Sequence, residues 1–170
     1  MTLLVEDGSN VAGANTYVDL AGVRAYALTR GVTLDPNDAI LEPLVHKAMD
    51  LLEGFRSRYQ GTKTTATQPL QFPRTGLQID CVDFDANSIP IELINAENQI
   101  IMEQHAGIDL SPTKSGAFII EDTVGPITTK YSDVEGPGVG KAPIMPVVED
   151  LLAPLFVACG QGLLLKTIKV

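Results

Sequence analysis

The stretch that decides the fold runs from Asp35 to Gly76 and reads DPNDAILEPLVHKAMDLLEGFRSRYQGTKTTATQPLQFPRTG. Its first half predicts the longest helix of the chain, because apolar residues recur at helical spacing and form one stripe. Asp35 is expected to cap this helix with Pro36 in the first turn, or Pro43 moves the start to about Leu41. The stripe marks this helix as the spine of the core; its members are Leu41, Leu44, Val45, Ala48, Leu51, Leu52, Phe55 and Tyr59.

The second half of the stretch joins a polar loop, Gly61 to Gln68, to the compact segment QPLQFPRTG. Phe72 is predicted to be a buried anchor, and Gly76 is expected to take a positive φ. Arg74 stands between a rigid proline and a flexible glycine, so its guanidinium is well placed to hold a carboxylate or backbone carbonyls. Two interpretations stay open for Arg74: a local contact within the chain, or a contact with a neighbouring subunit.

Composition excludes several classes of protein. The chain has 170 residues, which suits one domain, and its net charge is -9. Such acidity argues against a nucleic-acid binder and against an anionic membrane surface, since both partners require clustered Lys and Arg. Cys81 and Cys159 are far apart in the sequence, which favours two free thiols in a reducing compartment. No signal peptide or membrane span is recognisable, so a soluble protein made inside the cell is expected.

Three further helices are predicted. Asp19 is expected to cap the first, which ends near Gly31. The second begins near Pro90, with Asn87 or Ser88 as its cap, and ends at Gly107. Pro146 opens the last helix. Together with the spine, these segments predict a helical core over about residues 16–107 and a C-terminal helix and arm over about residues 145–170.

A β-hairpin is predicted over Ala117 to Tyr131, with Gly125-Pro126 at its turn. An isolated hairpin is marginally stable in water, and the run Phe118-Ile119-Ile120 suits a strand covered on both faces. We therefore expect this hairpin to contact another subunit.

The C-terminal segment from Gly160 to Val170 is apolar and follows a Gly-X-Gly break. The run Leu163-Leu164-Leu165 has no evident partner within the sequence, so we expect it to bind another protein. The predicted fold is mainly α: one domain built as a small helical bundle with a protruding β-hairpin and extended N- and C-terminal arms.

No motif for chemistry is recognisable. A P-loop, a dinucleotide fingerprint, a nucleophile elbow and a zinc pattern are all missing from the sequence. Asp80, Asp83 and Asp85 alternate, but they lack the Gly and Glu positions of a calcium loop. His46 and His105 have no companion at ligand spacing. The sequence therefore predicts no enzyme, no catalytic residue, no metal site and no cofactor.

Five segments carry a family resemblance, in this order: VEDGSNVAGANTYVDLAGVRAYALTRG, QPLQFPRTG, IPIELINAENQII, TVGPITTKYSD and MPVVEDLLAPLF. They resemble small tailed-bacteriophage proteins that are often labelled DnaT-like single-stranded-DNA-binding proteins. Those proteins are similar to head–tail connector, or adaptor, proteins that lie beneath the portal. The resemblance covers nearly the whole chain.

The resemblance implies a structural virion protein of the phage neck, made in the host cytoplasm. Its implied partners are other copies of itself in a ring, commonly a dodecamer, the portal protein and tail or nozzle proteins. Double-stranded DNA is expected only as passing cargo, because an acidic channel repels its backbone, and no membrane partner is expected. The alternative function is a replication accessory protein that binds single-stranded DNA, for which aromatic side chains in a basic groove are typical.

Overall fold

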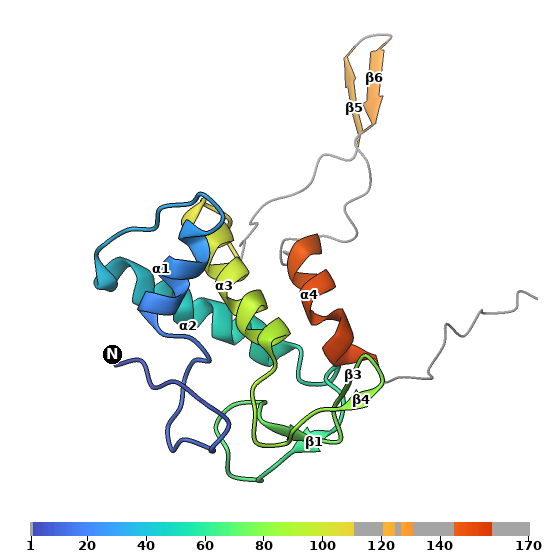
Figure 1. Ribbon diagram of the computed structural model, residues 1–170. Helices are drawn as coiled ribbons and strands as arrows, with labels where there is room; N and C mark the ends of the chain where they lie inside the picture. Colours follow the sequence, from blue (N-terminus) through green and yellow to red (C-terminus); the bar gives the residue numbers. More distant parts are fainter. Residues whose placement is uncertain (1, 111–120, 125–126, 131–144, 158–170) are drawn as a thin grey trace, which may run out of the picture. The chain divides into compact units, whose positions relative to one another are not determined.

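The computed structural model describes residues 2–110, 121–124, 127–130 and 145–157 (Figure 1). Within these residues the chain forms four helices: α1 (Leu20–Leu28), α2 (Asp38–Gly54), α3 (Ile91–His105) and α4 (Pro146–Phe156). One compact unit contains these helices and the strands β1 to β4, and a second unit contains β5 and β6. The predicted fold class, mainly α with a β-hairpin, is confirmed.

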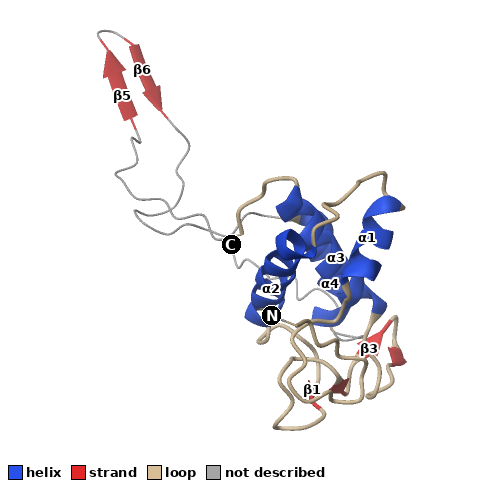
Figure 2. Cartoon of the chain, turned by 90° about the vertical axis from the view of Figure 1, so that its left-hand side faces the viewer, coloured by secondary structure: helices blue, strands red, loops and turns tan. Residues whose placement is uncertain are grey.

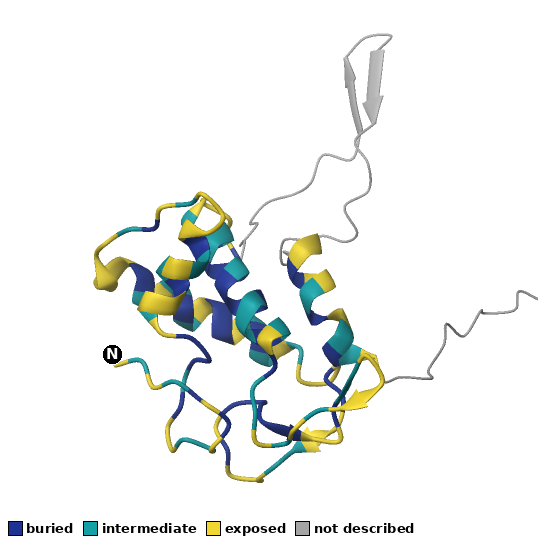
Figure 3. Ribbon diagram, in the orientation of Figure 1, coloured by how far each residue is buried: buried dark blue, intermediate teal, exposed yellow. Residues whose placement is uncertain are grey.

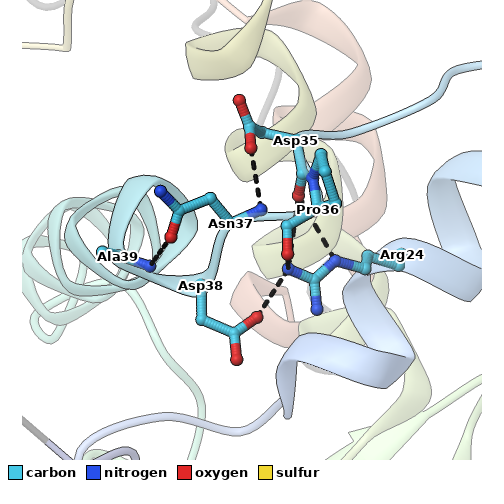
Figure 4. Close-up of polar contacts among 6 residues, drawn as sticks. All are labelled: Arg24, Asp35, Pro36, Asn37, Asp38 and Ala39. Carbon is cyan, nitrogen blue, oxygen red and sulfur yellow. Dashed lines mark hydrogen bonds and ion pairs between the residues drawn. The ribbon is translucent and has the colours of Figure 1, made fainter.

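The start of α2 differs from the prediction. Asn37 is the N-cap, and its side-chain oxygen accepts a hydrogen bond from the Ala39 N–H at 3.1 Å (Figure 4). Asp35 instead accepts from the Asn37 N–H at 2.8 Å, which closes a turn before the helix. Pro43 lies inside the helix without ending it. Both predicted starts, at Asp35–Pro36 and at about Leu41, are therefore wrong by a few residues.

The hydrophobic core lies between the helices, where their buried faces meet (Figure 3). The α2 stripe is buried at Leu41, Val45, Ala48 and Leu52, as its spacing predicts. However, α3 is the helix that packs against each of the other three. Its apolar face is shielded from solvent: Leu93, Ala96, Ile100 and Ile101 are fully buried. The prediction that α2 is the spine of the core is thus corrected: α3 is the central helix.

Of the predicted N-caps of α1 and α3, the first is confirmed and the second is wrong. Asp19 caps α1 by accepting from the Gly22 N–H at 2.6 Å. At α3 the N-cap residue is Pro90, which has no capping side chain. The predicted caps, Asn87 and Ser88, both bond to the carboxylate of Asp85 instead, so they form the turn that precedes the helix.

The N-terminal segment folds back on itself rather than extending as an arm. Val5 forms a parallel bridge with Thr16, and the Glu6 N–H donates to the Thr16 carbonyl at 2.9 Å. The carboxylate of Glu6 is only 2% exposed and accepts three backbone N–H groups, from Gly8, Asn10 and Val11. These three hydrogen bonds hold the turn that follows Glu6.

A buried glutamate of α3 holds the end of that segment. The side chain of Glu97 is fully buried, and it accepts the Tyr17 N–H at 3.0 Å. Thr16 Oγ1 lies 2.6 Å from the other carboxyl oxygen and 2.9 Å from the Val18 carbonyl. One hydroxyl proton cannot serve both oxygens, so a protonated Glu97 completes this set of hydrogen bonds. Burial favours the same state, because it raises the pKa of Glu97 to about 8.

Two short strand pairs cover one end of the helices (Figure 2). β1 (Thr62–Lys63) pairs with β2 (Arg74–Thr75), and β3 (Gln78–Ile79) pairs with β4 (Val82–Asp83). The turn between β3 and β4 places Asp80 and Cys81 at positive φ. Cys81 is disulfide-bonded, so the prediction of a free thiol at this position is wrong.

The predicted hairpin forms in the second unit. β5 (Glu121–Val124) pairs antiparallel with β6 (Ile127–Lys130), with Glu121 opposite Lys130 and Val124 opposite Ile127. This confirms the hairpin over its central residues. Its outer residues, Ala117 to Ile120 and Tyr131, lie outside the described residues, and the predicted pairing with another subunit stays a prediction.

Candidate functional site

The turn that follows α2 brings aromatic and basic side chains together. Phe55 caps the helix, and the Arg58 N–H donates to the Phe55 carbonyl at 2.8 Å. Tyr59 then points inward, where its hydroxyl donates to the Leu52 carbonyl at 3.0 Å. Phe55 stays half-buried, whereas Arg56 and Arg58 are exposed. The turn thus leaves one ring and two guanidinium groups at the surface.

Five aromatic rings form a continuous series from the core to this surface. The centroid distances are 6.4 Å from Tyr17 to Phe72, 5.0 Å from Phe72 to Tyr59, 5.4 Å from Tyr59 to Phe156 and 5.8 Å from Phe156 to Phe55. Tyr17, Phe72 and Tyr59 are buried, and Phe156 of α4 is half-buried like Phe55. Mostly edge-to-face contacts of this kind hold the two outer rings on a rigid support.

Arg58 lies over the outer end of the series. Its guanidinium carbon is 4.0 Å from the centroid of Phe156 and 5.1 Å from that of Phe55, which is the geometry of a cation–π contact. Among the described residues, no carboxylate lies within ion-pair distance of this guanidinium. Its positive charge is therefore available to a ligand.

One segment of this site is basic, although the chain as a whole is acidic. The segment from Gly54 to Ile79 contains four basic residues, Arg56, Arg58, Lys63 and Arg74, and no Asp or Glu. In contrast, the whole chain has 12 basic and 21 acidic residues. Three of the four basic side chains are exposed or half-exposed, Arg74 being the buried one. The segment that follows α2 is therefore basic although the net charge of the chain is negative.

The segment QPLQFPRTG packs on the buried side of the site. Phe72 is 1% exposed, which confirms its prediction as a buried anchor. Gln71 donates from its backbone and its side chain to the two carboxylate oxygens of Glu53, at 2.9 and 3.0 Å. Gly76 has a φ of 78°, as predicted. Burial, with the nearby charge of Glu53, raises the pKa of Tyr59, so this phenol stays neutral.

Arg74 is 7% exposed and holds backbone carbonyls of its own chain. Its Nε donates to the Gln60 carbonyl at 2.6 Å, and its Nη2 donates to the Gly61 carbonyl at 2.7 Å. The structure therefore places this side chain in the local contact, where it ties β2 to the turn after α2. A contact between Arg74 and another subunit stays a prediction.

The other residues predicted to contact partners are Phe118, Ile119, Ile120, Leu163, Leu164 and Leu165, and all of them lie outside the described residues. Their contacts stay predictions. Within the described part of the chain, no group of three His, Cys, Asp or Glu side chains could hold a metal ion. No helix there is long and apolar enough to cross a membrane.

Sequence reasoning missed Phe55, Arg58 and Phe156 as a site. The two phenylalanines belong to apolar stripes and therefore read as core residues, and Arg58 reads as part of the solvated face of the spine helix. The signal that could have found them is the acid-free segment, which stands out in a chain of net charge -9. The pairing of Phe55 with Phe156 depends on a contact across about 100 residues, which no local pattern contains.

The arrangement suits one kind of ligand chemistry. Half-buried rings and a guanidinium plane offer surfaces on which flat, unsaturated groups stack, as nucleobases do. Exposed arginines beside them can pair with phosphate groups.

Comparison with known proteins gives one finding. A family model described as "Putative DnaT-like ssDNA binding protein" matches residues 1–170 of the chain. No curated protein and no solved structure matches it.

This match corrects the expected function. The sequence was expected to encode a head–tail connector, with single-stranded-DNA binding as the alternative. The family model that matches the entire chain describes single-stranded-DNA binding, so the connector function is wrong and the alternative is favoured. Net charge was misleading because an average over the chain hides the basic segment that follows α2.

Proposed function

Because the chain belongs to the family of DnaT-like ssDNA binding proteins, we propose that it binds single-stranded DNA on the surface formed by Phe55, Arg58 and Phe156. The observation that carries this proposal is the position of Arg58 over two half-buried rings, with no carboxylate of the described residues at ion-pair distance. The role is that of a replication accessory protein.

The geometry favours unpaired bases over a duplex. A base can stack on an aromatic ring or on a guanidinium plane only when its own face is free, and in a duplex both faces are covered by neighbouring bases. The ring centroids of Phe55 and Phe156 are 5.8 Å apart and Arg58 lies over both, so the two rings support a guanidinium plane on which a base stacks.

The phosphate contacts come from the same segment. Arg56 and Arg58 are exposed, and Lys63 on β1 is half-exposed. With about three phosphates neutralised, log K should fall against log[salt] with a slope of about -2, since each contact contributes about -0.7 on a single strand. A weak, salt-sensitive interaction of this kind agrees with the negative net charge, which opposes binding at a distance.

The test is fluorescence anisotropy with a labelled oligothymidine at low salt. Arg58→Ala should weaken binding at least about tenfold, and Phe156→Ala by a similar factor, because one stacked base contributes about 1–3 kcal/mol. A labelled duplex of equal length should bind more weakly than the single strand.

Arg30 provides the matched control. It is also an exposed arginine over a ring, with its guanidinium carbon 3.3 Å from the centroid of Tyr26, but it lies just beyond α1. Arg30→Ala removes the same charge and should change affinity less than about twofold. Equal losses of DNA affinity in Arg30→Ala and Arg58→Ala would mean that only the net charge of the chain matters. Absence of binding at low salt would reject the proposed function.

Three other expectations stay predictions. A non-enzymatic role is proposed because a binding surface of rings and guanidinium groups needs no reactive group. The expected virion location and the expected assembly of several copies are likewise untested by the family match. A specific form of self-association is argued next, on other observations.

A further inference from the structure

A pocket of about 370 Å³ opens between α1 and the loop that leads to α2. Its volume is in the range of ligand-binding pockets, about 300–1,000 Å³. The lining is mostly apolar and consists of Arg24, Leu28, Val32, Thr33, Leu34 and Pro36. Leu28 at its edge is 68% exposed, which is unusual for a large apolar side chain. Burial of this surface by an apolar partner would be energetically favourable.

Arg24 forms the polar side of the pocket, and its positive charge is paired within the chain. Arg24 donates to the carbonyls of Asp35 and Pro36, and its Nη2 lies 2.6 Å from the Asp38 carboxylate (Figure 4). The Asp38 carboxylate is therefore paired with Arg24, whereas the Asp35 carboxylate, on the loop between the lining residues Leu34 and Pro36, accepts the Asn37 N–H at 2.8 Å. Asp38 is 62% exposed. The loop that leads to α2 and the first residue of α2 thus contribute two acidic residues, Asp35 and Asp38, against one paired arginine, which favours a partner that combines apolar and basic side chains.

We propose that this pocket binds the C-terminal segment Leu163–Val170 of a second copy of the chain. The segment reads LLLKTIKV, with three consecutive leucines, two lysines and no acidic residue. Its leucines match the apolar lining, and Lys166 and Lys169 are opposite in charge to Asp35 and Asp38, which lie just before and at the start of α2. No other segment of this length has consecutive leucines together with basic residues and no acidic residue. This interaction is independent of the proposed DNA surface.

Distance favours a second copy over the same chain. The Phe156 ring lies 5.8 Å from that of Phe55, so α4 ends at the C-terminal end of α2. The pocket lies at the opposite end, because Arg24 pairs with Asp38, the first residue of α2. The 17 residues of α2 span about 25 Å. Six peptide steps from Val157 to Leu163 span at most about 22 Å even when fully extended, so Leu163 of the same chain falls short of the pocket, whereas Leu163 of a second copy is not limited in this way.

Such a contact joins two different surfaces, the pocket of one copy and the tail of the next. It is therefore a head-to-tail contact that can repeat until the assembly closes. Each copy contributes one pocket and one tail, so a variant that loses either element still has the other.

Sedimentation velocity of the full chain over a range of concentrations tests the proposal. The native chain should associate, whereas Leu28→Asp in the pocket and Leu164→Asp in the tail should each lower the association constant at least about tenfold, because a buried leucine is replaced by a charge. Val82→Asp is the matched control: Val82 is also 68% exposed but lies on β4, and this variant should associate like the native chain.

Mixing the two defective variants gives the decisive result. The Leu164→Asp chain still offers an intact pocket, and the Leu28→Asp chain still offers an intact tail. The mixture should therefore form a dimer although neither variant associates alone. A native chain that stays monomeric, a Leu28→Asp chain that associates normally, or a mixture that stays monomeric would each overturn the proposal.

Discussion

The segments at the two ends of α2 use arginine in opposite ways. At the N-terminal end, Arg24 is held by two carbonyls and by Asp38, so little of its charge reaches a ligand. At the C-terminal end, Arg58 lies over two rings in a segment without any acidic residue. One end offers an apolar pocket with a paired arginine, and the other offers aromatic rings with free positive charge.

Charge alone would not distinguish a functional end from an ordinary one. Acidic residues near a helix N-terminus and basic residues near its C-terminus are both favoured by the helix dipole, whatever the protein does. The informative difference lies in the apolar groups: half-buried rings beside Arg58, and an open aliphatic pocket beside Arg24. The ring surface suits stacking and the aliphatic pocket suits a peptide, so the two ends are expected to bind different partners.

The largest effect is expected from Phe72→Ala, which removes the central support of the C-terminal end. Phe72 is 1% exposed and lies between Tyr17 and Tyr59, so the change should lower the free energy of unfolding by about 3–5 kcal/mol. Urea denaturation at constant pH measures it. Phe55→Ala, at a half-buried ring, should cost clearly less; equal costs would show that the ring series does not support the site.

The next effect is a pH dependence that originates at Glu97. Its folded pKa of about 8 lies above the ordinary value of 4.5, so the folded state binds the proton more tightly than the unfolded state. The resulting stabilisation is complete below pH 4.5, and it declines as pH rises until it is lost above about 8. The slope is at most about 1.4 kcal/mol per pH unit.

Glu97→Gln separates this group from all others. The amide can donate to Thr16 and accept from Tyr17, so it imitates the protonated acid and should remove most of the slope. Because the Tyr17 ring contacts Phe72, the loss at high pH should weaken the C-terminal end of α2 in particular. Urea denaturation between pH 5 and pH 9 measures both chains, and parallel curves would contradict the assignment.

A smaller effect is expected from a matched pair of glycines, one near each end of α2. Gly61 has a φ of 65°, and a Cβ there would lie 2.2 Å from the Thr75 carbonyl oxygen. Gly31 has a φ of 74° with nothing within 4 Å of its Cβ position. Gly31→Ala should cost about 1–2 kcal/mol for the left-handed backbone alone, and Gly61→Ala should cost more because β1 must also shift. Thermal unfolding compares them, and equal losses would contradict the close approach.

The smallest effect is expected from Asp38→Asn at the N-terminal end. The ion pair with Arg24 is 32% and 62% exposed on its two sides, so its loss should cost about 0.2–1 kcal/mol. DNA affinity should not fall, because the change lies at the other end of α2 and removes a negative charge. Anisotropy titration and urea denaturation of the same variant check the two statements.

Local patterns predicted much of the secondary structure. The spacing of Leu41, Val45, Ala48 and Leu52 marked α2, Asp19 marked the start of α1, and Gly125-Pro126 between two β-prone runs marked the hairpin. These features depend on interactions between residues that are close in the chain, which is why the sequence shows them. Boundaries were less secure, since Asn37 and Asp35 are both good caps and only the path of the chain selects one.

By itself, the amino-acid sequence determined the helical class, the hairpin and the buried position of Phe72, and its ordered segments pointed to the DnaT-like family. Only the tertiary structure decided that α3 is the central helix, that Glu97 is buried against Thr16, and that Phe156 completes the ring surface beneath Arg58. The physical reason is the range of the interactions. Periodicity and caps act over a few residues, whereas burial and ring contacts join residues about 80 to 100 positions apart, and packing alone selects which of them meet.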